Sequence, residues 1–119
     1  MIKLNIKVNF NANAVANKID NAIDKAQHAL DQQVLKDSNF FIPFDTGELM
    51  RSSLRHSKIG EGLIVWNTPY ARRLYYNPQY NFSKDVNPNA RGLWFEEAKA
   101  LHYDEWVKIA QQTFDENFK

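Results

Sequence analysis

The most informative stretch for the fold is residues 14–36, which read AVANKIDNAIDKAQHALDQQVLK. Apolar side chains recur there every three or four residues, as they do along one face of an α-helix. The charged side chains fall largely off this stripe. The spacing predicts one long amphipathic helix over 14–36, and its apolar face is formed by Val15, Ile19, Ala22, Ile23, Ala26, Leu30 and Val34.

The segment before this helix has a different period. In residues 2–10, apolar side chains alternate with Lys and Asn, which is typical of a half-buried strand. Asn11 or Asn13 can cap the helix that follows, because a short side-chain oxygen accepts a hydrogen bond from a free helix N–H. We expect residues 37–39 (Asp-Ser-Asn) to end that helix.

The middle of the chain predicts turns and two further strands. Residues 40–44 form an apolar run interrupted by proline, which favours irregular structure. Residues 45–48 (DTGE) have the spacing of a capping box and predict a short helical turn through Leu49 and Met50. Residues 52–58 and 63–67 are predicted strands, and the glycines of Gly60-Glu61-Gly62 suit a hairpin turn between them.

The last third of the chain is predicted to be mainly helical. Thr68-Pro69 is typical of a helix start and predicts a short helix to residue 76, with Thr68 as the cap. Residues 77–91, rich in Asn and Pro, predict a long loop that is mobile in the free subunit and ordered in an assembly. A helical pattern follows over 92–118, with a break expected near 102–104. The predicted fold is α+β over one domain, 1–119, with a small antiparallel sheet packed by a long N-terminal helix and a C-terminal helix.

Composition narrows the class of protein. The 119 residues contain no cysteine, which excludes disulfides and Cys-based zinc sites. The first residues lack the apolar run of a signal peptide, and no stretch approaches the ~20 apolar residues of a membrane span. We therefore expect a soluble protein, made in a cytoplasm, that needs no membrane partner.

Charge is unevenly distributed along the chain although the net charge is only +1. Residues 51–91 contain seven Lys and Arg against two acids, a balance of +5, whereas residues 92–119 contain three Lys against six acids, a balance of −3. Opposite potentials on one molecule can attract copies of it and set their register. An ordinary mixed surface is the alternative explanation.

The sequence predicts no catalytic centre, no metal site and no cofactor. His28, His56 and His102 are far apart in the sequence and none lies in a ligand motif. Ser52 and Ser53 lack the glycines of a nucleophile elbow. Adjacent acids such as Glu96 and Glu97 point to different sides of a helix, so they cannot act as a general acid/base pair unaided. We therefore expect the protein not to be an enzyme.

The basic region combines arginines with aromatic side chains. This composition could grip phosphates and stack bases, but it is also common at the centres of protein–protein contacts. We favour a protein contact and keep a small nucleic-acid-binding or regulatory protein as the alternative. The basic partners in that contact are predicted to be Arg51, Arg55, Arg72 and Arg73, with Tyr70, Tyr75 and Tyr76 beside them.

Three segments, in this order, resemble a known family. They are residues 45–53 (DTGELMRSS), 67–76 (NTPYARRLYY) and 87–99 (NPNARGLWFEEAK). The ordered set is similar to the minor capsid proteins encoded in head–tail gene clusters of phages of Gram-positive hosts. More distantly, it resembles the tail-completion and head–tail connector proteins of long-tailed phages. The resemblance covers roughly residues 40–119.

The resemblance implies a structural virion protein at the head–tail junction. It implies a homo-oligomeric ring, of about six or twelve copies, around the DNA channel, in contact with portal-side connector proteins and tail-tube proteins. Genomic DNA would pass through without sequence-specific binding. The roles of stopper, adaptor and tail-completion protein stay open. With Asp104 and Glu105 as further acidic candidates, we expect the subunit interface to contain Arg51, Arg55, Tyr70, Arg72, Arg73, Tyr76, Tyr80, Phe82, Glu96 and Glu97.

Overall fold

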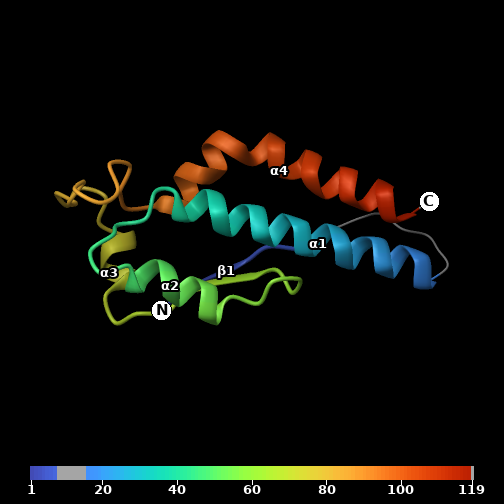
Figure 1. Cartoon of the computed structure of the whole chain (residues 1–119), viewed down its shortest axis with the longest axis horizontal. Coiled ribbons are helices and arrows are strands. Elements are labelled where there is room, and N and C mark those ends of the chain that lie inside the picture. The colour runs from blue at the N-terminus through green and yellow to red at the C-terminus, as the bar shows by residue number, and fades with distance from the viewer. Residues whose placement is uncertain (8–15, 119) are drawn as a thin grey trace.

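Two long helices and a two-stranded sheet make up most of the fold. The structure is a computed structural model that describes residues 1–7 and 16–118 (Figure 1). The predicted α+β class is confirmed. The predicted strand residues 8–10, the predicted caps Asn11 and Asn13, and residues 14 and 15 lie outside the described residues. The elements are β1 (Ile2–Asn5), α1 (Ala16–Asn39), α2 (Glu48–His56), β2 (Leu63–Trp66), α3 (Ala71–Tyr75) and α4 (Trp94–Phe118).

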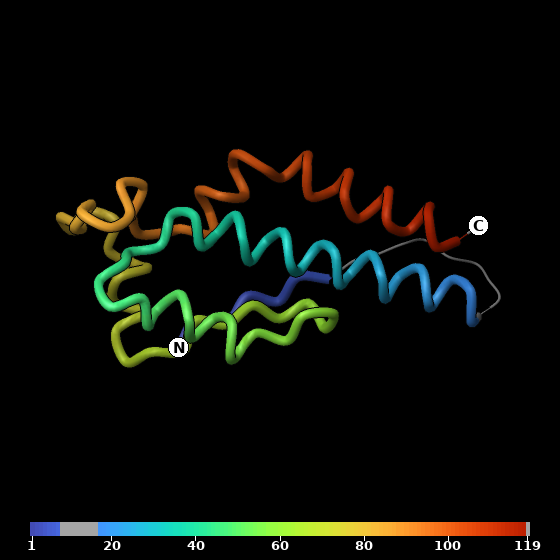
Figure 2. Tube along the Cα trace, in the orientation of Figure 1, coloured from blue at the N-terminus to red at the C-terminus, as the bar shows by residue number. Residues whose placement is uncertain are grey.

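Helices α1 and α4 lie side by side along the 51 Å length of the molecule (Figure 2). The predicted apolar stripe of α1 is buried at Ala22, Ala26, Leu30 and Val34. The helix ends at Asn39, within the predicted stop at 37–39, and extends three residues beyond the predicted helical range of 14–36. Tertiary contacts explain the extension, because the side chain of Asn39 is held by hydrogen bonds to α2 and β2.

The sheet pairs different segments from those predicted. Strand β2 pairs antiparallel with β1, with Ile2 opposite Trp66 and Asn5 opposite Leu63. The predicted strand over 52–58 is wrong, since these residues belong mostly to helix α2. The Ser52 and Ser53 hydroxyls each donate to a carbonyl three residues earlier, at 2.6 Å. Both serines are therefore buried with their polar groups satisfied, on the same helix face as Leu49.

The turn between α2 and β2 is held by a buried carboxylate of α1. One oxygen of Asp31 accepts from the N–H groups of Gly60 and Gly62, both at 2.8 Å, and the other accepts from Gln27 at 2.8 Å. Gly62 has φ of +74°, and a Cβ there would lie 1.9 Å from the Ile6 carbonyl oxygen. The glycine is therefore required for the close approach of the turn to the β1 segment.

An aromatic cluster joins the sheet to α3 and α4. The Trp94 ring meets Trp66 and Tyr75 edge to face, with centroids 5.8 and 4.7 Å apart. Helix α4 is continuous, so the predicted break near 102–104 is wrong. That stretch contains no Gly or Pro. Beyond it, the Trp106 indole donates to Asp37 at 2.7 Å and holds α4 against α1.

Both short helices begin near the predicted positions but without the predicted caps. Helix α2 follows Gly47, whose φ is +86°, and no side chain caps it, although Thr46 Oγ1 accepts from the Glu48 N–H at 3.3 Å. Helix α3 follows Tyr70, again without a side-chain cap. The Ala71 N–H bonds the backbone oxygen of Thr68 at 3.3 Å, so the predicted Thr68 side-chain cap is wrong.

Candidate subunit-contact surface

The corner before α2 is the first part of the candidate surface. A Cβ on Gly47 would lie 2.7 Å from both the Phe44 ring and the Arg51 guanidinium, so a glycine is needed here. The guanidinium of Arg51 donates to the Thr46 backbone oxygen at 2.8 Å. The DTG segment therefore works as a closed turn that fixes the direction of α2, which agrees with the structural role that its residues suggested.

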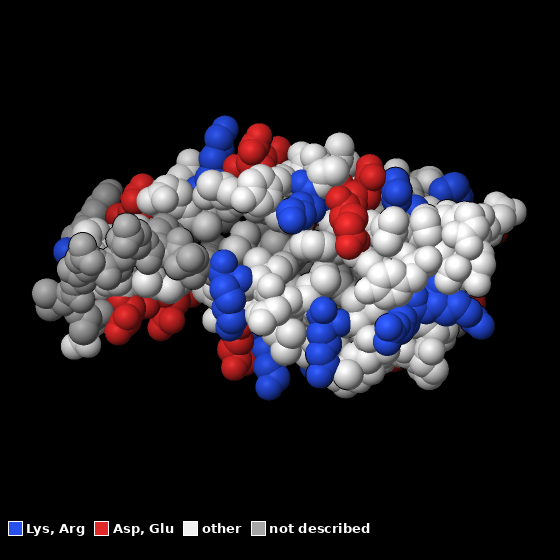
Figure 3. Space-filling view, turned by 180° about the vertical axis from the view of Figure 1, so that it is seen from behind, with Lys and Arg blue, Asp and Glu red and all other residues white. Residues whose placement is uncertain are grey.

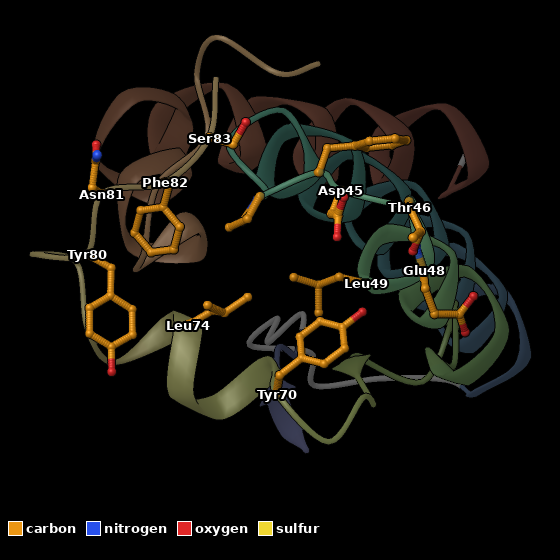
Figure 4. A pocket seen from close by; sticks show the side chains of 13 residues that line it. Asp45, Thr46, Glu48, Leu49, Tyr70, Leu74, Tyr80, Asn81, Phe82 and Ser83 are labelled. Carbon is orange, nitrogen blue, oxygen red and sulfur yellow. The ribbon is translucent and has the colours of Figure 1, made fainter. Parts of the chain in front are cut away.

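A groove opens between this corner, α3 and the loop over 77–91. Its volume is about 780 Å³. Figure 4 shows Leu49, Tyr70, Leu74 and Phe82 around the hollow, from α2, from the start of α3, from α3 itself and from the loop. We call it the aromatic groove. It is lined by Pro43, Phe44, Asp45, Thr46, Gly47, Glu48, Leu49, Tyr70, Leu74, Tyr80, Asn81, Phe82 and Ser83.

The four predicted arginines fall into two groups. Arg51 and Arg55 both pair with Glu48 of their own helix, Arg51 at 3.7 Å. Arg72 and Arg73 are exposed on α3 and form no ion pair with any residue that the structure describes. Arg72 lies over the Tyr76 ring at 5.9 Å, which orients its guanidinium. Of the four predicted arginines, the two on α3 are therefore the ones available to pair with a neighbour.

The predicted acidic residues also differ in their surroundings. Glu97 pairs with Arg91 at 2.8 Å, and Glu105 lies 3.4 Å from a nitrogen of His102. Glu96 and Asp104 are exposed on α4 and have no ion-pair partner in 1–7 or 16–118. These two acids are the ones left available for contacts outside the subunit.

The loop over 77–91 is anchored at its far end. Asn87 donates from its amide to the carbonyls of Phe40 and Ile42, at 3.0 and 2.8 Å. The Arg91 N–H bonds the Phe41 oxygen at 3.0 Å. Residues 79–86, by contrast, expose Tyr80 and Val86. The loop therefore has a fixed base and an exposed apolar tip.

The structure brings together only part of the predicted interface. Tyr70, Tyr80 and Phe82 converge on the aromatic groove. Arg72 and Arg73 lie on α3, Tyr76 directly follows that helix, and the two glutamates lie on α4. Sequence reasoning missed Phe44 and Leu74 as groove residues. The signal for Phe44 was its place in the apolar run of residues 40–44, directly before the DTG turn.

The described residues contain no group of three or more His, Asp or Glu that could hold a metal ion. Within the same ranges, no helix is long and apolar enough to cross a membrane. Figure 3, which looks onto the rear face, shows Lys and Arg side chains interspersed with Asp and Glu over both halves of this face. The features present are a charged helix, an apolar groove and an exposed loop, which together are typical of surfaces for binding other proteins.

This combination defines a small α+β protein with candidate contact surfaces. Residues 5–114 match the family model described as "Minor capsid protein", and the chain belongs to that family of phage structural proteins. Membership places the protein in the virion, in association with other virion proteins. No curated protein and no solved structure matches the chain.

Proposed function

We propose that this chain is a ring-forming subunit at the head–tail junction of a tailed bacteriophage. In a connector or tail-completion role it joins the portal complex of the capsid to the tail. Residues 1–119 act as one domain, which contacts copies of itself, portal-side proteins and tail-tube proteins. The DNA of the phage passes through the channel of the ring and is not read by sequence.

The observation that carries the proposal is that charges of opposite sign, without ion-pair partners among the described residues, stand on two different helices. Arg72 and Arg73 stand exposed at the end of the molecule that carries α3, and Glu96 and Asp104 stand exposed along α4 (Figure 1). A ring of identical subunits needs a heterologous contact, in which two different patches meet. Opposite charges on different elements supply such a pair of patches.

Charge alone does not account for the affinity of such a contact. An exposed ion pair contributes only about 0.2–1 kcal/mol, so the pairs set register and association rate. The aromatic groove and its neighbour Tyr76, which is 59% exposed, supply apolar surface that a partner would bury. Buried Tyr and Arg side chains contribute most of the binding energy at protein interfaces.

A charge swap tests the ring contact. We expect Arg72→Glu with Arg73→Glu to weaken self-association about tenfold or more, because attraction at two positions becomes repulsion. A Glu96→Arg, Asp104→Arg partner should restore part of the association in a mixed sample. Sedimentation velocity of the full-length chain over a concentration series gives both results.

The control is Lys25→Glu with Lys108→Glu, two exposed residues of α1 and α4 that make the same change in net charge. It should sediment like the unmodified chain. If the arginine variant keeps its association at both low and high salt, the α3 patch is not the subunit contact. If that variant assembles normally but loses affinity for a DNA duplex, the alternative nucleic-acid-binding function is favoured.

The junction role has its own test. Purified rings should co-sediment with isolated phage tails or with DNA-filled heads that lack tails, and light scattering should rise on mixing. Rings that bind neither particle would argue against a place at the junction while leaving ring formation intact.

A further inference from the structure

The two edges of the small sheet differ in whether their backbone groups are hydrogen-bonded. The outer edge of β2 is closed by the α2 side of the molecule. The Val65 N–H donates to the Ser57 hydroxyl at 2.9 Å, and the Lys58 N–H donates to the Leu63 oxygen at 2.8 Å. On the other side of the sheet, β1 has no strand neighbour besides β2 among residues 1–7 and 16–118.

The register shows which groups of β1 are left open. The Ile6 N–H donates to the Gly62 oxygen, so these residues form a hydrogen-bonded pair. Along an antiparallel ladder, hydrogen-bonded pairs alternate with non-hydrogen-bonded pairs, so every second residue of a strand bonds the same neighbour. Ile2 and Leu4, like Ile6, therefore direct their N–H and C=O groups at β2. The backbone groups of Lys3 and Asn5 must then face away from β2, and no residue of 1–7 or 16–118 bonds them.

A groove runs beside this open edge. It has a volume of about 590 Å³ and lies between the β1 segment and α4, with Leu30 of α1 also lining it. The α4 wall includes Phe95, Trp106 and Val107, of which Val107 is 50% exposed. The β1 face of the molecule is the rear face in Figure 3, which is hollowed near its middle with basic side chains beside the hollow.

We propose that this edge of β1 receives residues 80–86 of a second copy of the chain as a third strand. A two-stranded sheet is marginal by itself, and an unpaired edge is a template for strand addition. The inference rests on the proposed ring, to whose charged contact it adds a backbone contact: an edge on one subunit and a loop on the next, which is a heterologous pair.

The loop fits the edge by side-chain parity. In an extended chain, Tyr80, Phe82 and Val86 would point to one face and Asn81, Ser83 and Asp85 to the other. Lys84 shares the apolar face, and its long stem can carry the ammonium group to the rim. The β1 segment has the matching division, with an apolar face of Ile2, Leu4 and Ile6 and a polar face of Lys3, Asn5 and Lys7.

Charge favours the loop over a second β1 as the occupant. Two β1 edges side by side would bring Lys3 and Lys7 against their own copies, and like charges on neighbouring strands repel. The loop brings Asp85 to that polar face instead. Figure 1 shows the loop projecting beyond α3 at one end of the molecule, away from its own β1. It is therefore placed to reach a neighbour.

Disulfide trapping tests the contact directly, because the chain contains no cysteine of its own. Two single variants, Asn5→Cys and Ser83→Cys, are mixed in equal amounts as full-length protein, oxidised, and separated on a non-reducing gel. We expect about tenfold more cross-linked dimer than in a mixture of Ser83→Cys with Asp24→Cys, an exposed control on α1. A dimer of Asn5→Cys alone, at the level of the mixture, would mean that β1 pairs with β1 and would overturn the proposal.

A backbone variant separates strand pairing from mere proximity. Asn5→Pro removes the open N–H, whereas Asn5→Thr keeps it in a residue that favours strands. The proline should abolish disulfide trapping between Lys3→Cys on the same chain and Ser83→Cys on a second chain, and the threonine should not. Both chains should show the same far-UV circular dichroism. Equal trapping in the two variants, or none in either, contradicts strand addition.

The double variant Asn5→Cys, Ser83→Cys distinguishes this inference from the ring itself. A cross-linked ladder that ends at one closed size supports both. Rings seen by electron microscopy without any ladder would leave the proposed function standing and refute the strand contact. An open ladder without rings would support the strand contact and refute the ring.

Discussion

Replacing Asp31 with alanine tests the buried contact that joins α1 to the turn before β2. The carboxylate is fully buried and is the acceptor for two backbone N–H groups, of Gly60 and Gly62, at 2.8 Å each. Alanine leaves both donors and the Gln27 amide without that partner. We expect the turn to loosen and the β1 segment, which is bonded to Gly62, to loosen with it.

The size of the effect follows from the lost hydrogen bonds. A buried donor left without a partner costs about 1–3 kcal/mol, so two backbone donors give a loss of about 4 kcal/mol in the free energy of unfolding. The entropy of unfolding is about 2.1 cal/mol/K per residue, or about 0.25 kcal/mol/K for this chain. The melting temperature should therefore fall by about 15 °C.

Two further variants sharpen the experiment. Asp31→Asn keeps one oxygen for the two glycine N–H groups and disturbs mainly the contact with Gln27, so it should lose only about 1–2 kcal/mol. Asp24→Ala, on an exposed position of the same helix, should stay within about 0.5 kcal/mol of the unmodified chain.

Thermal and urea unfolding followed by circular dichroism measure all three variants. An Asp31→Ala chain as stable as the Asp24→Ala control would refute the reasoning, because the buried hydrogen bonds would then contribute nothing net. So would an asparagine variant less stable than the alanine variant.

Two other changes probe the segments around the proposed contacts. Gly62→Ala should cost about 3 kcal/mol or more, measured by urea unfolding, because its Cβ would lie 1.9 Å from a backbone oxygen of the paired segment; Gly60→Ala, which meets only a His28 side-chain nitrogen at 3.3 Å, should cost less. Asn87→Ala removes two hydrogen bonds to the 40–42 segment and should speed amide exchange over 87–91 several-fold without changing exchange in α1; unchanged exchange at 87–91 would show that the amide does not anchor the loop.

The sequence alone predicted an element where a single segment showed the hydrophobic repeat of a helix or a strand. The stripe from Ala22 to Val34 predicted α1 because a 3.6-residue repeat has a buried face whatever it packs against. The alternation that begins at Ile2 predicted β1 in the same way. The turn at 45–47, the loop at 77–91 and the aromatic residues at 70, 80 and 82 could also be recognised from residue type alone.

Other features depended on partners distant in the sequence. Residues 52–58 were predicted to form a strand. Instead, Ser52 and Ser53 are buried in α2, where they bond the Asn39 side chain, the Asn67 backbone and carbonyls of their own helix. The pairing of β1 with β2 spans about sixty residues, and no local signal contains it.

For the charged residues, too, the sequence determined one property and the fold another. The sequence determined that residues 51–91 are basic and that the C-terminal part is acidic. Only the tertiary structure decided that Arg51 and Arg55 turn to Glu48, and that Arg91 turns to Glu97, whereas Arg72 and Arg73 remain exposed and without an ion-pair partner among the described residues. The physical reason is that an ion pair depends on a separation of a few ångströms in space, which composition along a chain does not specify.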